Sequence, residues 1–230
     1  MAKIILDTMS LTEVGLIVYE RSIGICEKIS PLLNHKQKEY ARIMIRKGNV
    51  KTYFKPITIE NYDITFHLIP NCLGKADLKK YGARVLIAGE FRYKGDRFYS
   101  LLIGNCGQIS IYTTHFLERY VERHLGDDSP INADTFIKYL METDGVIYGF
   151  DEGVDNKIQW ATSIGNVCGC VLHPRILFHK TFIDNSTIIK GKKKEANDKG
   201  NVLMNRTVLN RVGNRTLPYG ISKYFNFKLE

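Results

Sequence analysis

Apolar residues recur at helical spacing through the first fifth of the chain. The segment Ser10-Leu11-Thr12-Glu13 has the form of a capping box, in which serine accepts from an amide one turn on and glutamate reaches back to the cap. A helix over residues 11–29 is therefore predicted. Pro31 should end it, because proline lacks the amide donor that a helix interior needs, and a second helix should occupy residues 34–46. The pattern predicts a pair of N-terminal helices.

The composition changes in the middle of the chain, where β-branched and aromatic residues alternate with polar ones. This pattern is typical of strands, and the intervening Asn, Gly and Asp residues are typical of turns. Residues 93–97, Tyr-Lys-Gly-Asp-Arg, have the form of a hairpin connection. The expected strands are 51–54, 64–68, 84–93 and 97–103.

A helix starting near His115 should follow a strand at 108–112, with Thr113 or Thr114 as its cap. A further amphipathic helix is expected at 132–142, and three closing strands at 157–162, 167–172 and 176–183. The predicted fold class is α+β: an antiparallel β-sheet of six or seven strands, a packed helix bearing His and Arg, an N-terminal helical pair and a basic C-terminal tail. The corresponding divisions are residues 1–48, the α+β core 49–184 with the candidate site, and the tail 185–230.

Composition excludes several classes of protein. The chain has 230 residues and 44% hydrophobic content, enough for a packed core. Its apolar runs are far shorter than the roughly 20 residues of a membrane-spanning helix, and its N-terminus lacks the features of a secretory signal. Five cysteines at irregular spacing indicate reduced thiols. We expect a cytoplasmic protein that does not engage a membrane.

The net charge of +9 is concentrated in the tail. Residues 185–230 hold ten Lys or Arg and three Asp or Glu, whereas residues 1–184 hold twenty-three against twenty-one. Such a segment favours polyanions through counterion release, and the alternative is a solvated charged segment. The candidate nucleic-acid-binding residues are the five densest lysines: Lys190, Lys192, Lys193, Lys194 and Lys199.

His115, Arg119 and Arg123 lie four residues apart, so one helix would carry them along a single ridge. Histidine can transfer protons near neutral pH, and arginine presents a charged planar fork to phosphate oxygens. RNA cleavage by internal attack needs a base, an acid and positive charge at the transition state. The alternative is a solvated face on which Glu118 and Glu122 pair with these three residues.

A late strand offers partners for this helix. If residues 179–183 alternate across a strand, His179 and Thr181 share one face. A second proton donor and a hydroxyl would then meet the His115 helix. The alternative is a strand whose polar face is merely hydrated.

The segment Thr114 to Arg123, Thr-His-Phe-x-Glu-Arg-Tyr-x-Glu-Arg, followed by the strand Thr181-Phe182-Ile183, resembles small proteins of Bacteroides type and their phages. Its helix resembles the His-x-x-x-Arg-x-x-x-Arg helix of toxin-like domains in the barnase, EndoU, colicin and RelE (BECR) superfamily. The resemblance covers residues 99–184. It implies metal-independent RNA cleavage with roles for His115, Arg119 and Arg123, and for His179 or Thr181.

Other sites are less well supported by the sequence. Cys168, Cys170, His173 and His179 include zinc-ligand types, but their spacing favours thiols that fill a sheet core. The motifs of zinc proteases, P-loop NTPases, dinucleotide-binding proteins and serine hydrolases do not occur. The acidic pairs 127–128 and 151–152 fall in expected loops. No metal and no cofactor is expected.

Three functions are consistent with these observations. The first is a metal-independent, toxin-like endoribonuclease in which His115 is the acid or base, Arg119 and Arg123 hold the transition state, and His179 with Thr181 assists. The second is a non-catalytic nucleic-acid or nucleotide binder, with RNA a better candidate than DNA. The third is a phage-type inhibitor or interaction protein, with an antitoxin or a host factor as partner.

Overall fold

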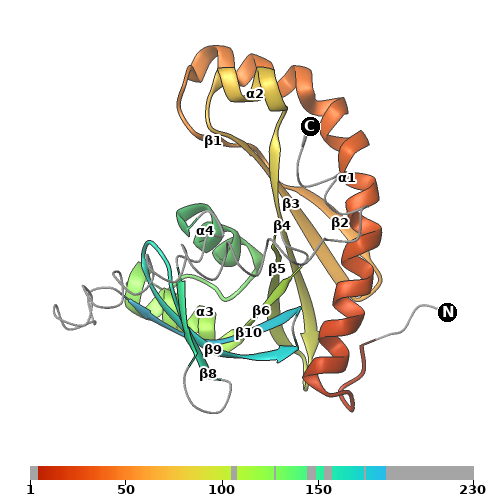
Figure 1. Cartoon of the computed structure of the whole chain (residues 1–230), viewed down its shortest axis with the longest axis vertical. Coiled ribbons are helices and arrows are strands. Elements are labelled where there is room, and N and C mark those ends of the chain that lie inside the picture. The colour runs from red at the N-terminus through yellow and green to blue at the C-terminus, as the bar shows by residue number, and fades with distance from the viewer. Residues whose placement is uncertain are drawn as a thin grey trace.

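The structure is a computed structural model that describes residues 5–104, 108–126, 128–143, 149–152, 157–173 and 175–184. It confirms the α+β class, with one large mixed sheet and helices on both of its faces (Figure 1). The helical elements are α1 (Leu11–Lys47), α2 (Lys75–Tyr81), α3 (Thr114–Tyr120), the π-helix η1 (Val121–Leu125) and α4 (Ala133–Thr143). The expected basic tail, 185–230, lies outside the described residues.

Within the described residues, ten strands form the sheet, more than the six or seven expected. Their order is β1-β3-β4-β5-β6-β10-β9-β8-β7, and β2 also pairs with β3. Among these described strands, all pairs are antiparallel except β6 with β10, which is parallel. The strands are β1 (Thr52–Tyr53), β2 (Ile57–Asn61), β3 (Ile64–Cys72), β4 (Arg84–Tyr93), β5 (Arg97–Ile103), β6 (Ile109–Thr113), β7 (Gly149–Glu152), β8 (Lys157–Ala161), β9 (Gly165–His173) and β10 (Ile176–Asp184).

The predicted helical pair is wrong, because α1 is one continuous helix with Pro31 inside it. Its capping box is present: the amide of Ser10 donates to Glu13 Oε2 at 2.7 Å, and the amide of Glu13 donates to Ser10 Oγ at 3.3 Å. A proline inside a helix costs about 3 kcal/mol. An apolar stripe continues on both sides of it, and burial of one large aliphatic side chain contributes about 1.5–3 kcal/mol. Its buried members include Ile25, Ile29, Leu33, Tyr40 and Met44.

The sheet has two apolar faces, which we call the α1 face and the α3 face. On the α1 face, Phe66, Ile87, Leu101, Ile111 and Phe178 belong to one core with α1 and α2. On the α3 face, a second core includes the apolar side chains of α3 and α4 together with strand residues such as Ile69, Leu102, Tyr112, Val167 and Phe182. Because side chains alternate along a strand, β3, β4, β5, β6 and β10 each contribute to both cores.

The hairpin expected at residues 93–97 is present between β4 and β5. Lys94, Gly95 and Asp96 all have positive φ, as a tight connection between twisted strands requires. The carboxylate of Asp7 accepts from the amides of Lys94 at 2.6 Å and Gly95 at 2.9 Å. The N-terminal segment thereby fixes the far end of this hairpin. The short helix α2 was not expected from the sequence.

Candidate functional site

Helix α3 begins directly where β6 ends, and Thr113 is its cap. Thr113 Oγ1 accepts from the amide of Phe116 at 3.1 Å and donates to the carbonyl oxygen of Lys180 at 3.0 Å. The expected capping by Thr113 or Thr114 is therefore confirmed for Thr113. Phe116 and Tyr120 are fully buried on the α3 face. The cap and this burial together hold α3 against β10.

Two of the three residues expected on one ridge lie on the solvated side of α3. The His115 side chain is 52% exposed, and its Nδ1 lies 3.3 Å from Glu118 Oε2. Arg119 forms an ion pair with Glu122 one turn later. Pairs of this kind between exposed side chains contribute little to stability. These contacts match the alternative in which neighbouring glutamates neutralise the helix.

Arg123 does not continue this ridge, because the helix widens into η1. The amide of Gly126 donates to the carbonyl of Val121 at 2.9 Å, five residues back, and Gly126 adopts a left-handed conformation. Arg123 Nη1 donates to the carbonyl oxygen of Phe182 at 2.8 Å. The guanidinium therefore contacts the backbone of β10.

The expectation that His179 and Thr181 share one face is wrong, because β10 contains a bulge between them. His179 pairs with Gly169, and Thr181 pairs with Cys168, the direct neighbour of Gly169 in β9. Two steps along β10 therefore correspond to one step along β9, which is a bulge. The extra residue, Lys180, places Thr181 on the α1 face, the side to which Phe178 contributes. His179 lies on the α3 face. The structure therefore does not bring Thr181 to the His115 helix.

His179 is completely buried, and its ring stacks on Tyr112 with ring centroids 4.3 Å apart. Burial lowers the pKa of His179 from 6.5 to about 3, so the ring is neutral at physiological pH. It lies on the same face as α3 but inside the core, whereas His115 is half exposed. These two histidines do not open into a common site in this arrangement.

The residues considered as possible zinc ligands are also divided between the two faces of the sheet. Cys168 and Cys170 are two residues apart on the α1 face, and His179 lies on the other face. Burial raises the pKa of the Cys168 thiol. Across the described ranges, no group of three or more His, Cys, Asp and Glu side chains is placed to hold a metal ion.

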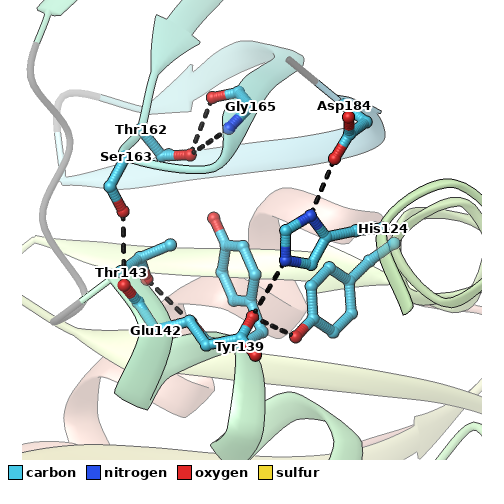
Figure 2. A network of polar contacts seen from close by, with 9 residues as sticks. His124, Tyr139, Glu142, Thr143, Thr162, Ser163, Gly165 and Asp184 are labelled. Atoms are coloured by element: carbon cyan, nitrogen blue, oxygen red, sulfur yellow. Dashed lines mark hydrogen bonds and ion pairs between the residues drawn. The ribbon is translucent and has the colours of Figure 1, made fainter. Parts of the chain in front are cut away.

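A polar cluster that the sequence did not reveal lies where η1, α4 and β10 meet (Figure 2). His124 Nδ1 lies 2.7 Å from Asp184 Oδ2, and its Nε2 lies 3.4 Å from Glu142 Oε2. The hydroxyl of Tyr120 donates to the same Glu142 oxygen at 2.6 Å, and the Tyr120 ring stacks on His124. We call these four residues the His124 cluster.

The end of α4 is also joined to the turn between β8 and β9, as Figure 2 shows. Ser163 Oγ donates to the carbonyl oxygen of Glu142 at 3.2 Å. Within the turn, Thr162 Oγ1 donates to the Gly165 carbonyl at 2.7 Å and accepts from its amide at 3.1 Å. Side-chain hydrogen bonds thereby join the end of α4, next to the His124 cluster, to the β8–β9 turn.

The geometry of His124 has a clear chemical consequence. A neutral imidazole has one N–H, so it can donate to only one of two carboxylates. A carboxylate lies at each ring nitrogen of His124, and the shorter of the two contacts is the one to Asp184. His124 is 26% exposed on its side chain, and both nitrogens already contact protein groups. The arrangement suits a clamp between three elements better than a catalyst that must exchange protons with a substrate.

The spacing of Tyr120 and His124, four residues apart on a predicted helix, was the one local signal of this cluster. Nothing local connected them to Asp184, sixty residues away from His124.

Comparisons with the models of known protein families, with curated proteins and with solved structures found no match. No helix of the described segments has the length and apolarity needed to cross a membrane.

Proposed function

We propose that this protein binds nucleic acid, with RNA as the first candidate. The observation that carries the proposal is the division of charge along the chain. Residues 1–100 hold seventeen Lys or Arg against ten Asp or Glu, a net charge of +7, and residues 185–230 also hold +7. The segment between them, 101–184, holds six against eleven, a net charge of −5. Strongly basic segments bind phosphate backbones through counterion release.

This distribution favours binding over cleavage at the predicted site. The segment that carries α3 is acidic, and the partly exposed cation Arg119 is paired with Glu122. Arg123 contacts a backbone carbonyl, and Thr181 lies on the opposite face of the sheet. Both arginines of this region therefore already contact protein oxygen atoms, and an RNA phosphate near α3 would have to replace those contacts. Affinity for RNA has to come from the basic segments.

Metal-independent RNA cleavage is the second candidate, and the arrangement of His115 favours it. Its ring is half exposed, and Glu118 contacts Nδ1. A carboxylate on one ring nitrogen fixes the orientation of an imidazole and leaves the other nitrogen to exchange a proton with a substrate. Arg119, one turn later, would have to exchange Glu122 for a phosphate oxygen. The resemblance to BECR toxin domains points to the same helix.

One pair of assays separates the candidates. Labelled RNA is incubated with the full chain in EDTA, and binding is followed by fluorescence anisotropy at increasing salt. Binding that weakens steeply with salt, without cutting, supports the first candidate. Cutting in EDTA that His115→Ala abolishes, and that the control His35→Ala retains, supports the second.

Each remaining outcome contradicts a specific part of the proposal. Cutting that EDTA abolishes would rule out the metal-free mechanism, and cutting that survives His115→Ala would rule out the role of His115. Failure to bind RNA or DNA even at low salt would contradict both candidates. It would leave a protein-interaction function, with an antitoxin-like or host protein as partner.

We also propose a cytoplasmic location. Cys72, Cys168 and Cys170 are thiols, and the reducing cytoplasm preserves thiols of this kind.

A further inference from the structure

The positive charge of the described residues is concentrated on one end of the molecule. Residues 36–55 and 75–84 hold eleven Lys or Arg and two acids, a net charge of +9, equal to that of the whole chain. The first segment contains the last turns of α1 and strand β1, and the second contains α2. We call the exposed Lys and Arg side chains of these two segments the basic helical surface.

Two hydrogen bonds bring the two segments together. The amide of Lys75 donates to the carbonyl of Gly48 at 3.3 Å, so α2 begins beside the end of α1. Gln37 Nε2 donates to the carbonyl of Leu78 at 3.5 Å, so α2 continues back along α1. The two helices are antiparallel neighbours at one end of the molecule, as Figure 1 shows. Cations separated by some forty residues in sequence therefore form one surface.

The two helices turn their apolar sides inward and their cations outward. Tyr40 and Met44 of α1 and Leu78 of α2 are buried in the core. Arg42, Arg46, Lys79 and Lys80 are exposed. A surface helix with this division presents only its polar side to a partner.

Both acidic residues of these segments form ion pairs with cations of the same segments. Glu39 pairs with Lys36 at 3.1 Å, and Asp77 pairs with Arg84 at 2.8 Å. With eleven Lys or Arg and only these two acids, the two segments keep a large positive excess. Mutual repulsion between like charges opposes folding, and a bound polyanion would relieve it.

We infer that the basic helical surface is the docking surface for the phosphate backbone of nucleic acid. Residues 36–47 of α1 extend over about 17 Å at the rise of an α-helix. Along one strand of a duplex the phosphates are roughly 3.4 Å apart on the axis, so this length matches about five phosphates of one strand. Contacts between lysine or arginine and phosphates position a nucleic acid without reading its sequence.

An anionic membrane fits this surface less well. Amphipathic helices bind membranes by burying their apolar side in the bilayer. In α1 and α2 that side is occupied by the protein core, through Tyr40, Met44 and Leu78. The apolar side chains that remain exposed here, such as Ile45 and Tyr81, lie among cations. Phosphate recognition by the polar side is the better match.

This inference rests on the proposed function for its class of partner, but not on cleavage. The sequence indicated the tail, residues 185–230, as the source of affinity for RNA. The basic helical surface is a second source, within the folded part of the chain. The surface also lies apart from α3 and β10, which occupy another part of the molecule (Figure 1).

The test compares two double charge reversals in the full chain. Arg42→Glu with Lys79→Glu changes the basic helical surface. Lys94→Glu with Arg97→Glu makes the same change of charge at the β4–β5 hairpin, where both side chains are exposed. The ten residues of β4 place that hairpin about 30 Å from α2. The probe is a short fluorescein-labelled RNA, and anisotropy is measured from low to moderate salt.

The surface variant should bind RNA at least about tenfold more weakly near 0.1 M salt. The slope of log affinity against log salt should fall by about 1.4, which corresponds to two lost phosphate contacts on a single strand. The hairpin variant should retain most of the affinity and the slope. Circular dichroism and thermal unfolding establish that both variants are folded.

Three results would overturn the inference. Equal loss of RNA affinity in both variants would mean that binding depends on the net charge of the protein and not on the position of the cations. Unchanged binding in the surface variant, with normal binding by the unmodified chain, would place the contact elsewhere and leave the proposed function intact. Loss of binding to phosphatidylserine vesicles, with RNA binding retained, would identify the surface as a membrane contact. No RNA binding by the unmodified chain would contradict the proposed function itself.

Discussion

His124 and Asp184 are joined at 2.7 Å between Nδ1 and Oδ2, although sixty residues separate them in the chain. The contact links the π-helical turn after α3 to the last residue of β10. Because Glu142 contacts the second ring nitrogen, the same imidazole also reaches α4. The end of α3 is therefore fixed by a polar clamp in addition to its apolar core.

Replacing His124 by alanine should destabilise the fold. The change removes the ring that Asp184 and Glu142 both contact, and loss of a partly buried, charge-assisted interaction costs about 1–3 kcal/mol. Urea unfolding followed by circular dichroism measures this change in the free energy of unfolding. His115→Ala is the matched control, and at its exposed position the effect should stay within about 0.5 kcal/mol. Equal effects of the two substitutions would show that the clamp contributes nothing.

Protonation of His179 should make the protein less stable in mild acid. Burial lowers its pKa in the folded state to about 3, from 6.5. The unfolded chain therefore binds a proton that the folded chain does not, and stability is lost as pH falls from about 6.5 toward 3. The loss approaches about 1.4 kcal/mol per pH unit, or about 2 kcal/mol at pH 5.

The variant His179→Phe tests this pH dependence, since phenylalanine can keep the stacking on Tyr112 without titrating. The difference in unfolding free energy between the variant and the unmodified chain should change in favour of the variant as pH falls from 7 to about 4. His35→Gln, at an exposed position of α1, should show no such change. A constant difference across this range for His179→Phe would contradict the assignment.

Substitution of Gly165 by alanine should be poorly tolerated. A Cβ there would lie 2.4 Å from the carbonyl oxygen of Ile183 and 2.6 Å from Cζ of Phe182, so β9 or β10 would have to move. Overpacking of this kind costs about 1–3 kcal/mol. Gly24→Ala is the contrasting control, because its Cβ meets nothing within 4 Å and α1 gains a better helix former. Thermal unfolding should show opposite shifts, and a stabilised Gly165→Ala would contradict the packing described.

Replacing Pro31 by alanine should stabilise α1. The substitution restores an amide donor inside the helix and removes a steric conflict with the preceding turn, for a gain of about 1–3 kcal/mol. Pro31 is exposed, so the core is not disturbed. Lys28→Ala, one turn earlier and also exposed, should have little effect. An unchanged or lower urea midpoint for Pro31→Ala would mean that the proline serves some other purpose.

Local patterns predicted most of the secondary structure. Strands at 84–93 and 97–103 match β4 and β5, and the helix predicted at 132–142 matches α4 within one residue. The capping box at Ser10 and the cap at Thr113 also form as expected. These features depend on side chains and backbone groups a few residues apart, and such distances can be read from the order of residues.

The candidate site could not be predicted to the same extent, for two reasons. A single extra residue in β10, Lys180, moved Thr181 to the other face, and periodicity gives no indication of a bulge. The wider turn of η1 ended the predicted ridge before Arg123. Both are irregularities of one residue that depend on how the chain packs.

The sequence by itself determined the α+β class, the positions of most helices and strands, and the cationic excess of the chain. Only the tertiary structure decided where these charges and polar groups meet. It placed the cations of α1 and α2 on one surface and brought His124 to Asp184 and Glu142. The physical reason is that periodicity and capping act over a few residues, whereas a binding surface or a polar cluster depends on contacts between segments that only packing brings together.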